Sequence, residues 1–212
     1  MSSYSMKRYF LLVLSIIALA FNAKAQDAET MFKAAVEKLK SYDNIEIEFD
    51  YNMINTEAGI YETMQGSGFL QGNAYKLKIM GQDVICDGHT TWTYNADAEE
   101  VMIGEVDSEG GNSPLAIVSS YNDNITAKYL EGTNGNTKQI EAKPLFGDEN
   151  IDRIVVTIDE NTLEIKDVHV FDKDKNEFVY EITKFVTNQK LPADFFTFKE
   201  SDYPDAEIID MR

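Results

Sequence analysis

Residues 45–53 read IEIEFDYNM and alternate apolar with polar side chains. The odd-numbered positions from Ile45 to Met53 are apolar, and the positions between them hold two glutamates, an aspartate and an asparagine. Because successive side chains of a strand point to opposite faces, this period of two predicts a strand with one apolar and one polar face. A sheet built from such strands must cover its apolar face.

The same alternation recurs further along the chain, between turns that contain Gly, Asn or Asp. More strands are predicted at residues 75–79, 101–106, 153–159, 163–171 and 177–185. A helical period occurs at 27–42, and Ser113-Pro114 begins a short second helix that runs to Tyr121. One long helix and one short helix are too little to cover a flat sheet of about nine strands. We therefore predict that the sheet curls around the helices and leaves an apolar cavity.

The first 25 residues predict a secretory signal peptide. Lys7 and Arg8 precede an uncharged run at residues 9–21, and Ala23-Lys24-Ala25 has the small-x-small cleavage pattern. The apolar run is too short to span a membrane comfortably, although an uncleaved anchor is the alternative. We expect residues 26–212 to form a single domain in the periplasm.

Composition excludes several classes of function. The chain of 212 residues has 37 acidic and 19 basic side chains, for a formal net charge of −18. Such an acidic surface argues against binding to nucleic acid and against docking on anionic lipid. Cys86 is the only cysteine, so no internal disulfide can form. With one cysteine and two histidines a zinc site is hard to build, and we predict no metal site.

Cys86, Asp87 and His89 stand within four positions and have the chemistry of a nucleophile with its base. Catalysis would also need a cleft, an orienting group and an oxyanion site. Asp87-Gly88 lies between two strand-like runs, which is a strong hairpin signal. We therefore predict a turn with a semi-buried cysteine and no catalytic residues.

Two further stretches look like known loops. Residues 172–176 resemble the start of a calcium loop, but Glu177 stands where that loop needs glycine, so we predict a hairpin turn, with a weak surface cation as the alternative. Gly66-Ser67-Gly68 lacks the third glycine of a nucleotide-binding loop, and small residues in a strand fit a bend better.

The run from Gly68 to Ile103 resembles the LolA-type periplasmic carriers of outer-membrane lipoproteins. That family has a strand led by glycine, a strand with an aromatic residue and then the motif Asp-Gly-x-x-x-Trp-x-Tyr, here Asp87, Gly88, Trp92 and Tyr94. The order of elements also agrees outside this run, down to a late FFTF segment at 195–198. One departure is clear: Gly72-Asn73 replaces the Arg-Pro pair of well-studied members, whose Arg helps to hold the lid closed.

The resemblance implies an α+β fold: an incomplete antiparallel barrel of about ten strands, with both helices as a lid over a hydrophobic cavity. It implies a carrier without a cofactor that binds the acyl chains of lipoproteins. Its partners would be these lipoproteins, an inner-membrane transporter and an outer-membrane acceptor, and we expect a monomer. The alternatives are a lipid or lipoprotein sensor on the same scaffold and an enzyme that uses Cys86 and His89.

For such a carrier we expect apolar side chains of the lid and the sheet to contact the acyl chains. Methionines suit an adaptable cavity of this kind because they are flexible, and Met31, Met53 and Met64 are candidates. The principal candidates for lipid binding are Phe32 and Leu39 in the first helix and Ile47, Phe49, Tyr51, Phe69, Tyr75, Leu77, Ile79, Trp92 and Tyr94 on the sheet. The alternative for Trp92 and Tyr94 is that their motif serves the hairpin instead.

Overall fold

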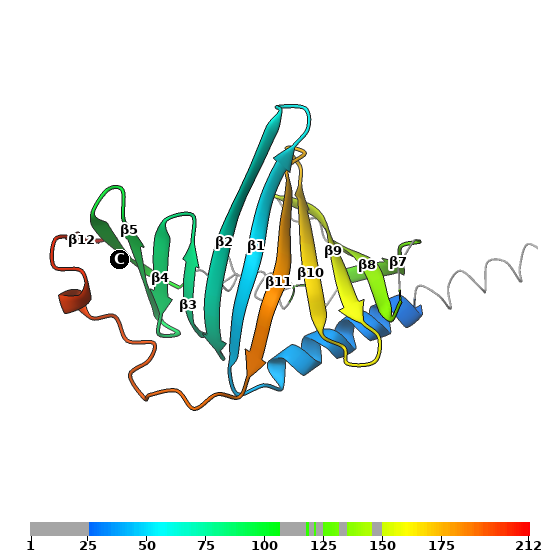
Figure 1. Cartoon of the computed structure of the whole chain (residues 1–212), viewed down its shortest axis with the longest axis horizontal. Helices are drawn as coiled ribbons and strands as arrows, with labels where there is room; N and C mark the ends of the chain where they lie inside the picture. The colour runs from blue at the N-terminus through cyan, green and yellow to red at the C-terminus, as the bar shows by residue number, and fades with distance from the viewer. Residues whose placement is uncertain (1–25, 107–117, 119–120, 122–124, 132–134, 146–149) are drawn as a thin grey trace, which may run out of the picture.

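The computed structural model describes residues 26–106, 118, 121, 125–131, 135–145 and 150–212. The expected signal peptide lies outside the described residues, as does the expected second helix apart from Val118 and Tyr121. The described part contains a helix at residues 26–40, one twelve-stranded sheet and a short 3-10 helix, η1, at Glu200–Asp202 (Figure 1).

The first six strands form consecutive antiparallel hairpins. Their bounds are β1 Ile45–Asn55, β2 Ile60–Gln71, β3 Ala74–Ile79, β4 Gln82–Cys86, β5 Thr90–Asn95 and β6 Glu100–Glu105. The next five pair in the same way. They are β7 Ile125–Tyr129, β8 Thr137–Pro144, β9 Ile151–Asp159, β10 Ile165–Asp172 and β11 Glu177–Thr187.

The two halves of the sheet join at its centre, where β1 pairs antiparallel with β11. The full order is β12-β6-β5-β4-β3-β2-β1-β11-β10-β9-β8-β7, and β12 (Glu207–Asp210) pairs parallel with β6. The open antiparallel sheet with an N-terminal helix confirms the predicted fold class. The strand number exceeds the predicted ten because β7 and β12 are edge strands of only five and four residues, too short to show a clear period.

The predicted alternation of β1 is confirmed. Ile47, Phe49 and Tyr51 are buried on one face, called the inner face here. On the opposite, outer face, Glu46 and Glu48 both accept hydrogen bonds from the ammonium of Lys184 on β11. The hydrogen bond from Lys184 lowers the pKa of Glu46, with a further contribution from the amide of Gln189.

The N-terminal helix covers the inner face of the half-sheet that runs from β11 to β7 (Figure 1). Phe32 is fully buried, and its neighbours one turn away are buried with it. Burying one large apolar side chain stabilises a fold by about 1.5–3 kcal/mol, so this apolar stripe holds the helix in place. No helix within the described ranges has the length and apolar character needed to cross a membrane.

Residues 188–206, called the C-terminal segment here, connect β11 to β12. The segment begins at a set of polar contacts around the buried side chain of Asn44. The amide of Asn44 donates to the carbonyl of Gln189 at 2.8 Å and accepts from its N–H at 2.9 Å. The chain then passes to the far edge of the sheet, where β12 closes the open side of β6.

Candidate functional site

The structure brings eight of the eleven candidate residues together on the inner face and the helix that covers it. The register explains the grouping, since Ile47 lies beside Gly68, which in turn lies beside Leu77. All eight belong to or pack against one apolar cluster, with Tyr75 and Ile79 only half-buried. They are Phe32, Leu39, Ile47, Phe49, Tyr51, Tyr75, Leu77 and Ile79.

Phe69, Trp92 and Tyr94 lie on the outer face instead, apart from the eight candidates on the inner face and its helix. Phe69 lies next to Lys76 in the register, and Trp92 lies next to Ile85, each one position out of phase with the inner-face residues. Because the side-chain period of a strand is two, a difference of one position moves a side chain to the other face.

The C-terminal segment covers these three aromatic residues. Their rings contact its own aromatic rings one by one, at centroid distances of 4.9 Å, 5.5 Å and 4.7 Å. The pairs are Phe69–Phe195, Trp92–Phe198 and Tyr94–Tyr203. The ammonium of Lys76 lies 5.0 Å from the centroid of Phe195 and adds a cation–π contact. The Trp and Tyr of the family motif therefore hold the C-terminal segment in this fold.

An aromatic row crosses the centre of the inner face on β1 and β11. Phe49 and Tyr51 both contact Tyr180, at centroid distances of 5.7 Å and 5.1 Å, and Tyr51 stacks on Phe178. Burial raises the pKa of both tyrosines, so their hydroxyls stay neutral and the row carries no charge.

Glycines on β2 leave space for the aromatic rings of this row. A Cβ placed on Gly66 would fall 2.4 Å from Cζ of Phe49, because the Phe49 ring lies directly over the β2 backbone there. The predicted bend at Gly66-Ser67-Gly68 is instead part of a continuous strand, and the glycines serve the close approach of ring and backbone.

Sequence reasoning missed several half-buried apolar residues that pack against the same cluster. Leu70 and Val84 extend it along β2 and β4, and Phe178 and Ile182 extend it along β11. What these residues share is the register of their strands relative to β1, which places them on the inner face. The alternation within a single strand does not reveal this register. Met53 and Met64, which the sequence did suggest, also pack against this cluster and lie at the β1–β2 end of the inner face.

A cleft of about 620 Å³ opens beside β2, at the tip of the β3–β4 hairpin. Its lining comes from both faces of the sheet: Phe49 and Ile79 belong to the inner face, and Gln65 and Lys78 to the outer face. The cleft therefore connects the two faces. It forms because β3 ends at Ile79 whereas β2 continues to Ile60.

The stretch around Cys86 is a turn, as predicted. The carboxylate of Asp87 accepts the N–H groups of His89 and Thr90 at 2.9 Å and 2.8 Å, which lowers its pKa. Gly88 has a φ of 96°, a value that other residues rarely adopt. Burial raises the pKa of the Cys86 thiol, whereas a nucleophilic cysteine needs a lowered one.

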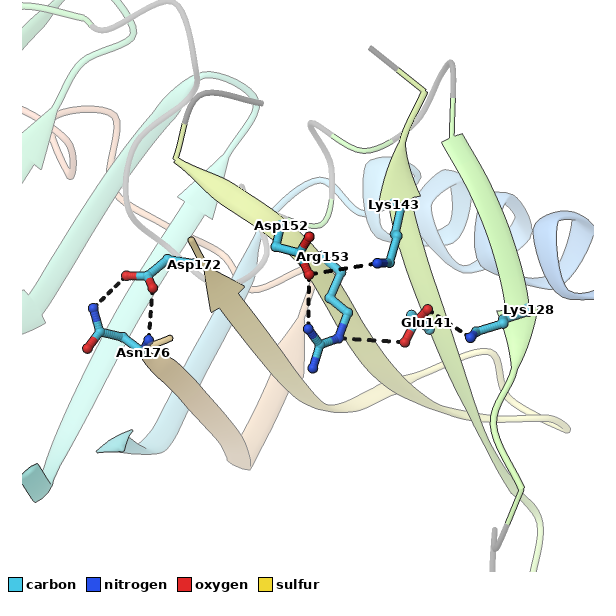
Figure 2. Close-up of polar contacts among 7 residues, drawn as sticks. All are labelled: Lys128, Glu141, Lys143, Asp152, Arg153, Asp172 and Asn176. Atoms are coloured by element: carbon cyan, nitrogen blue, oxygen red, sulfur yellow. Dashed lines mark hydrogen bonds and ion pairs between the residues drawn. The ribbon is translucent and has the colours of Figure 1, made fainter. Parts of the chain in front are cut away.

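The predicted hairpin turn at 172–176 is also confirmed. Figure 2 shows Asp172 accepting the backbone N–H and the side-chain amide of Asn176, at 2.8 Å and 2.6 Å. Within the residues that the structure describes, no three His, Cys, Asp or Glu side chains gather as metal ligands would.

The outer face of β7–β9 carries a chain of ion pairs (Figure 2). Arg153 contacts Glu141 at 3.6 Å and Asp152 at 3.0 Å, and these carboxylates also contact Lys128 and Lys143. The guanidinium lies 3.8 Å from the centroid of Phe171. Since the charges of both signs alternate at the surface, the network stabilises the sheet only modestly and forms no basic patch.

Comparison with known proteins points to one family. Residues 80–199 match the family model of LolA, described as outer membrane lipoprotein carrier protein. The outer-membrane lipoprotein carrier protein of Haemophilus influenzae (strain PittEE) is 26% identical over 181 residues, which cover 82% of this chain and 84% of that protein. Its counterpart in Actinobacillus succinogenes (strain ATCC 55618 / DSM 22257 / CCUG 43843 / 130Z) is 25% identical over 208 residues, 95% of each chain.

A solved structure shares the fold. An uncharacterized conserved protein from Thermus thermophilus superposes with a TM-score of 0.54, over 84% of this chain and 96% of that chain. The two sequences are 8% identical, so this likeness concerns the fold alone.

Proposed function

This chain belongs to the LolA family of outer membrane lipoprotein carrier proteins, and we therefore propose that it carries lipoproteins through the periplasm with their acyl chains on the inner face of the sheet. The single observation that carries the proposal is the continuous apolar inner face, which is larger than the helix at 26–40 buries. The half-buried members Met64, Tyr75, Ile79 and Val84 lie on β2, β3 and β4, away from the strands that the helix covers.

The physics of the cargo requires such a face. Moving an acyl chain of about 15 methylenes into water costs about 12 kcal/mol, at roughly 0.8 kcal/mol for each methylene. A lipoprotein therefore does not cross an aqueous compartment without a shielded apolar site. Because the cargo must also be released, an adaptable surface suits the task better than a rigid one, and flexible methionines provide it.

The helix at 26–40 serves as the lid in this proposal. Gly72-Asn73 forms the β2–β3 turn at the place of the family's Arg-Pro pair, so another contact must hold the helix. Lys38 donates to the carbonyl of Thr162 in the β9–β10 turn, and the hydroxyl of Tyr129 lies 3.6 Å from Sδ of Met31. Among the described residues, the buried side chains of the helix are all apolar. An entering acyl chain can replace apolar contacts with contacts of the same kind.

The remaining features of the proposal follow from the carrier role. Residues 1–25 act as a cleaved signal peptide, and residues 26–212 form one domain. The chain receives its cargo from an inner-membrane transporter and passes it to an outer-membrane acceptor. It works as a monomer and uses no covalent step.

The experiment replaces one half-buried residue of the inner face with a charge. Phe49 is unsuitable, because it is 1% exposed and a buried carboxylate there would unfold the protein. Ile79→Glu places the charge beside the expected acyl chains at a half-buried position. The matched control is Val186→Glu, on the outer face beside Glu46. We expect Ile79→Glu to bind an acylated peptide at least about tenfold more weakly and the control to bind normally.

Native mass spectrometry of the protein purified from its own periplasm identifies the cargo. An acylated polypeptide bound one-to-one supports the carrier. A free lipid alone favours the alternative, a lipid-binding or sensing protein on the same scaffold. Equal binding by both Glu variants would show that the inner face is not the site.

A further inference from the structure

Within the part of the chain that the structure describes, half of β2 has an open backbone edge. On one side β2 pairs with β1 from Ile60 to Leu70, which is all of the strand except its last residue. On the other side its pairing with β3 covers only Ser67 to Gln71. Among the described residues, no strand pairs with 60–66 on that side, and Figure 1 shows β2 rising well beyond the β3–β4 hairpin.

The hairpin geometry identifies which backbone groups face this edge. Gln71 and Ala74 close the two-residue turn between β2 and β3. In such a turn the closing pair is hydrogen-bonded, so Gln71 directs its N–H and C=O toward β3. Because these directions alternate along an antiparallel strand, Tyr61, Thr63 and Gln65 direct theirs toward the open edge. Their side chains are exposed, and that of Tyr61 is 65% exposed.

The open edge begins at the cleft that connects the two faces. Gln65, Gly66 and Ser67 line this cleft together with Phe49 and Ile79 of the inner face. The cleft is thus an exit from the apolar inner face, and the unpaired edge of β2 at residues 60–66 leads away from it.

We propose that this edge binds the polypeptide that directly follows the acylated end of the cargo, as an added antiparallel or parallel strand along Tyr61–Gln65. The inference rests on the proposed function, because only an acylated polypeptide has to keep its lipid inside while its chain leaves. An extended peptide that adds a strand gains main-chain hydrogen bonds whatever its side chains are. One edge can therefore serve many different cargo sequences.

The proposal explains why the edge is left open beside an apolar face. Exposed strand edges favour unwanted pairing, and proteins commonly block them with charges, proline or a bulge. Glu62 is the only charged side chain of residues 60–66, and it belongs to the inner face, opposite Met53. The outer-face side chains Tyr61, Thr63 and Gln65 are uncharged and leave the backbone accessible.

Three synthetic probes test the inference on the exported protein. The first is a hexapeptide with palmitoyl chains on its N-terminal cysteine. The second is the same molecule with every later backbone amide N-methylated, and the third carries the same acyl chains on a poly(ethylene glycol) linker. We expect the wild-type protein to bind the first probe about tenfold more tightly than the other two, as the gain of one or two backbone hydrogen bonds requires.

A substitution at the open edge of β2 provides a second, independent test. Thr63→Pro removes one N–H from the open edge, and proline is tolerated on such edges. Thr63→Ala is the matched control, because both variants lose the hydrogen bond from the Thr63 hydroxyl to Asn52 and only proline loses the N–H. The proline variant is expected to bind all three probes equally, and the alanine variant to retain the tenfold preference.

The possible failures are distinct. If the wild-type protein binds no acylated probe, the proposed function fails and this inference falls with it. If it binds all three equally tightly, the carrier role stands and the strand-addition inference is overturned. Sedimentation of the free protein tests whether a second copy of the chain occupies the edge instead. A wild-type dimer that Thr63→Pro dissociates would assign the edge to that second copy and overturn the inference.

Discussion

The indole of Trp92 lies parallel to the ring of Phe198, with centroids 5.5 Å apart and an angle of 5° between the planes. Phe198 stacks in turn on Tyr203 at 5.4 Å. The stack joins β5 to the C-terminal segment on the outer face. We expect Trp92→Ala to lower the free energy of unfolding by about 2–3 kcal/mol, because the half-buried indole is removed and Phe198 loses its stacking partner. Urea denaturation measures this change.

Limited proteolysis locates the effect of Trp92→Ala. Cleavage should appear within residues 190–206 before it appears in the sheet, since the C-terminal segment loses its contact with β5. Trp92→Phe keeps an aromatic ring and serves as the control, with a smaller loss of stability. Normal stability combined with lost binding of acylated peptide would instead place Trp92 in the binding site.

Gly66→Ala tests the close approach of the Phe49 ring to β2. The added Cβ would lie 2.4 Å from the ring, so the ring or the strand must shift. Such overpacking typically costs about 1–3 kcal/mol, to be measured as the change in the midpoint of urea unfolding. Gly104→Ala is the control, because its Cβ would meet Thr91 Oγ1 at an ordinary 3.7 Å. Equal stability of the two variants would contradict the packing described for Phe49.

Cys86 should react slowly in the folded protein. Burial raises the pKa of its thiol, so less thiolate is present at neutral pH, and the residue is fully buried. We expect iodoacetamide at pH 8 to alkylate the native protein about 100-fold or more slowly than the urea-unfolded protein. Cys86→Ala should retain binding of acylated peptide. Rapid alkylation of the native state would revive the hypothesis of a nucleophilic cysteine.

His169 makes the stability of the protein depend on pH. Its Nε2 lies 3.4 Å from Asp167 and its Nδ1 lies 2.7 Å from Glu177. The carboxylate of Asp167, and then that of Glu177, raise the pKa of His169. The protonated ring is thus favoured in the folded state. The resulting stabilisation is complete below the unfolded pKa of about 6.5 and is lost as the pH rises through the folded pKa.

Replacing the imidazole measures this dependence. His169→Gln should cost more stability at pH 5.5 than at pH 9, as determined by chemical denaturation at each pH. Asp167→Asn removes the largest cause of the pKa shift and should reduce the difference between the two pH values. An equal cost of His169→Gln at both pH values would show that the ion pairs do not contribute.

The sequence predicted individual strands and turns better than it predicted which strands pair with one another. The period of two identifies β1 and β11 clearly, and Asp87-Gly88 identifies the β4–β5 turn, because these signals are local. The pairing of β1 with β11 has no local signal, since it depends on the packing of the whole sheet. The parallel pairing of β12 depends on the irregular segment before it, which has neither a strand nor a helix period.

The faces of the strands show a second limit. Phe69 and Leu70 are adjacent and both apolar, so the period alone does not decide which of them points inward. Trp92 and Tyr94 alternate with Thr91 and Thr93, and the larger apolar side chains suggest the inner face. The structure has the reverse arrangement, because the C-terminal segment covers the outer face and makes it a second apolar layer.

The central β1–β11 pair has a consequence for the order in which the chain can fold. Strand β1 is among the first parts of the domain to be synthesised, and it keeps one side unpaired until β11 follows. Asn44 likewise cannot form its hydrogen bond with Gln189 until that residue, 145 positions later, has been synthesised. The hairpins from β2 to β6 can form early, but the sheet gains its continuity only when almost the whole polypeptide has emerged. Contacts between such distant positions make folding slow. A nascent chain therefore presents an incomplete apolar surface, and a truncation before β11 should leave two separate half-sheets without a common core.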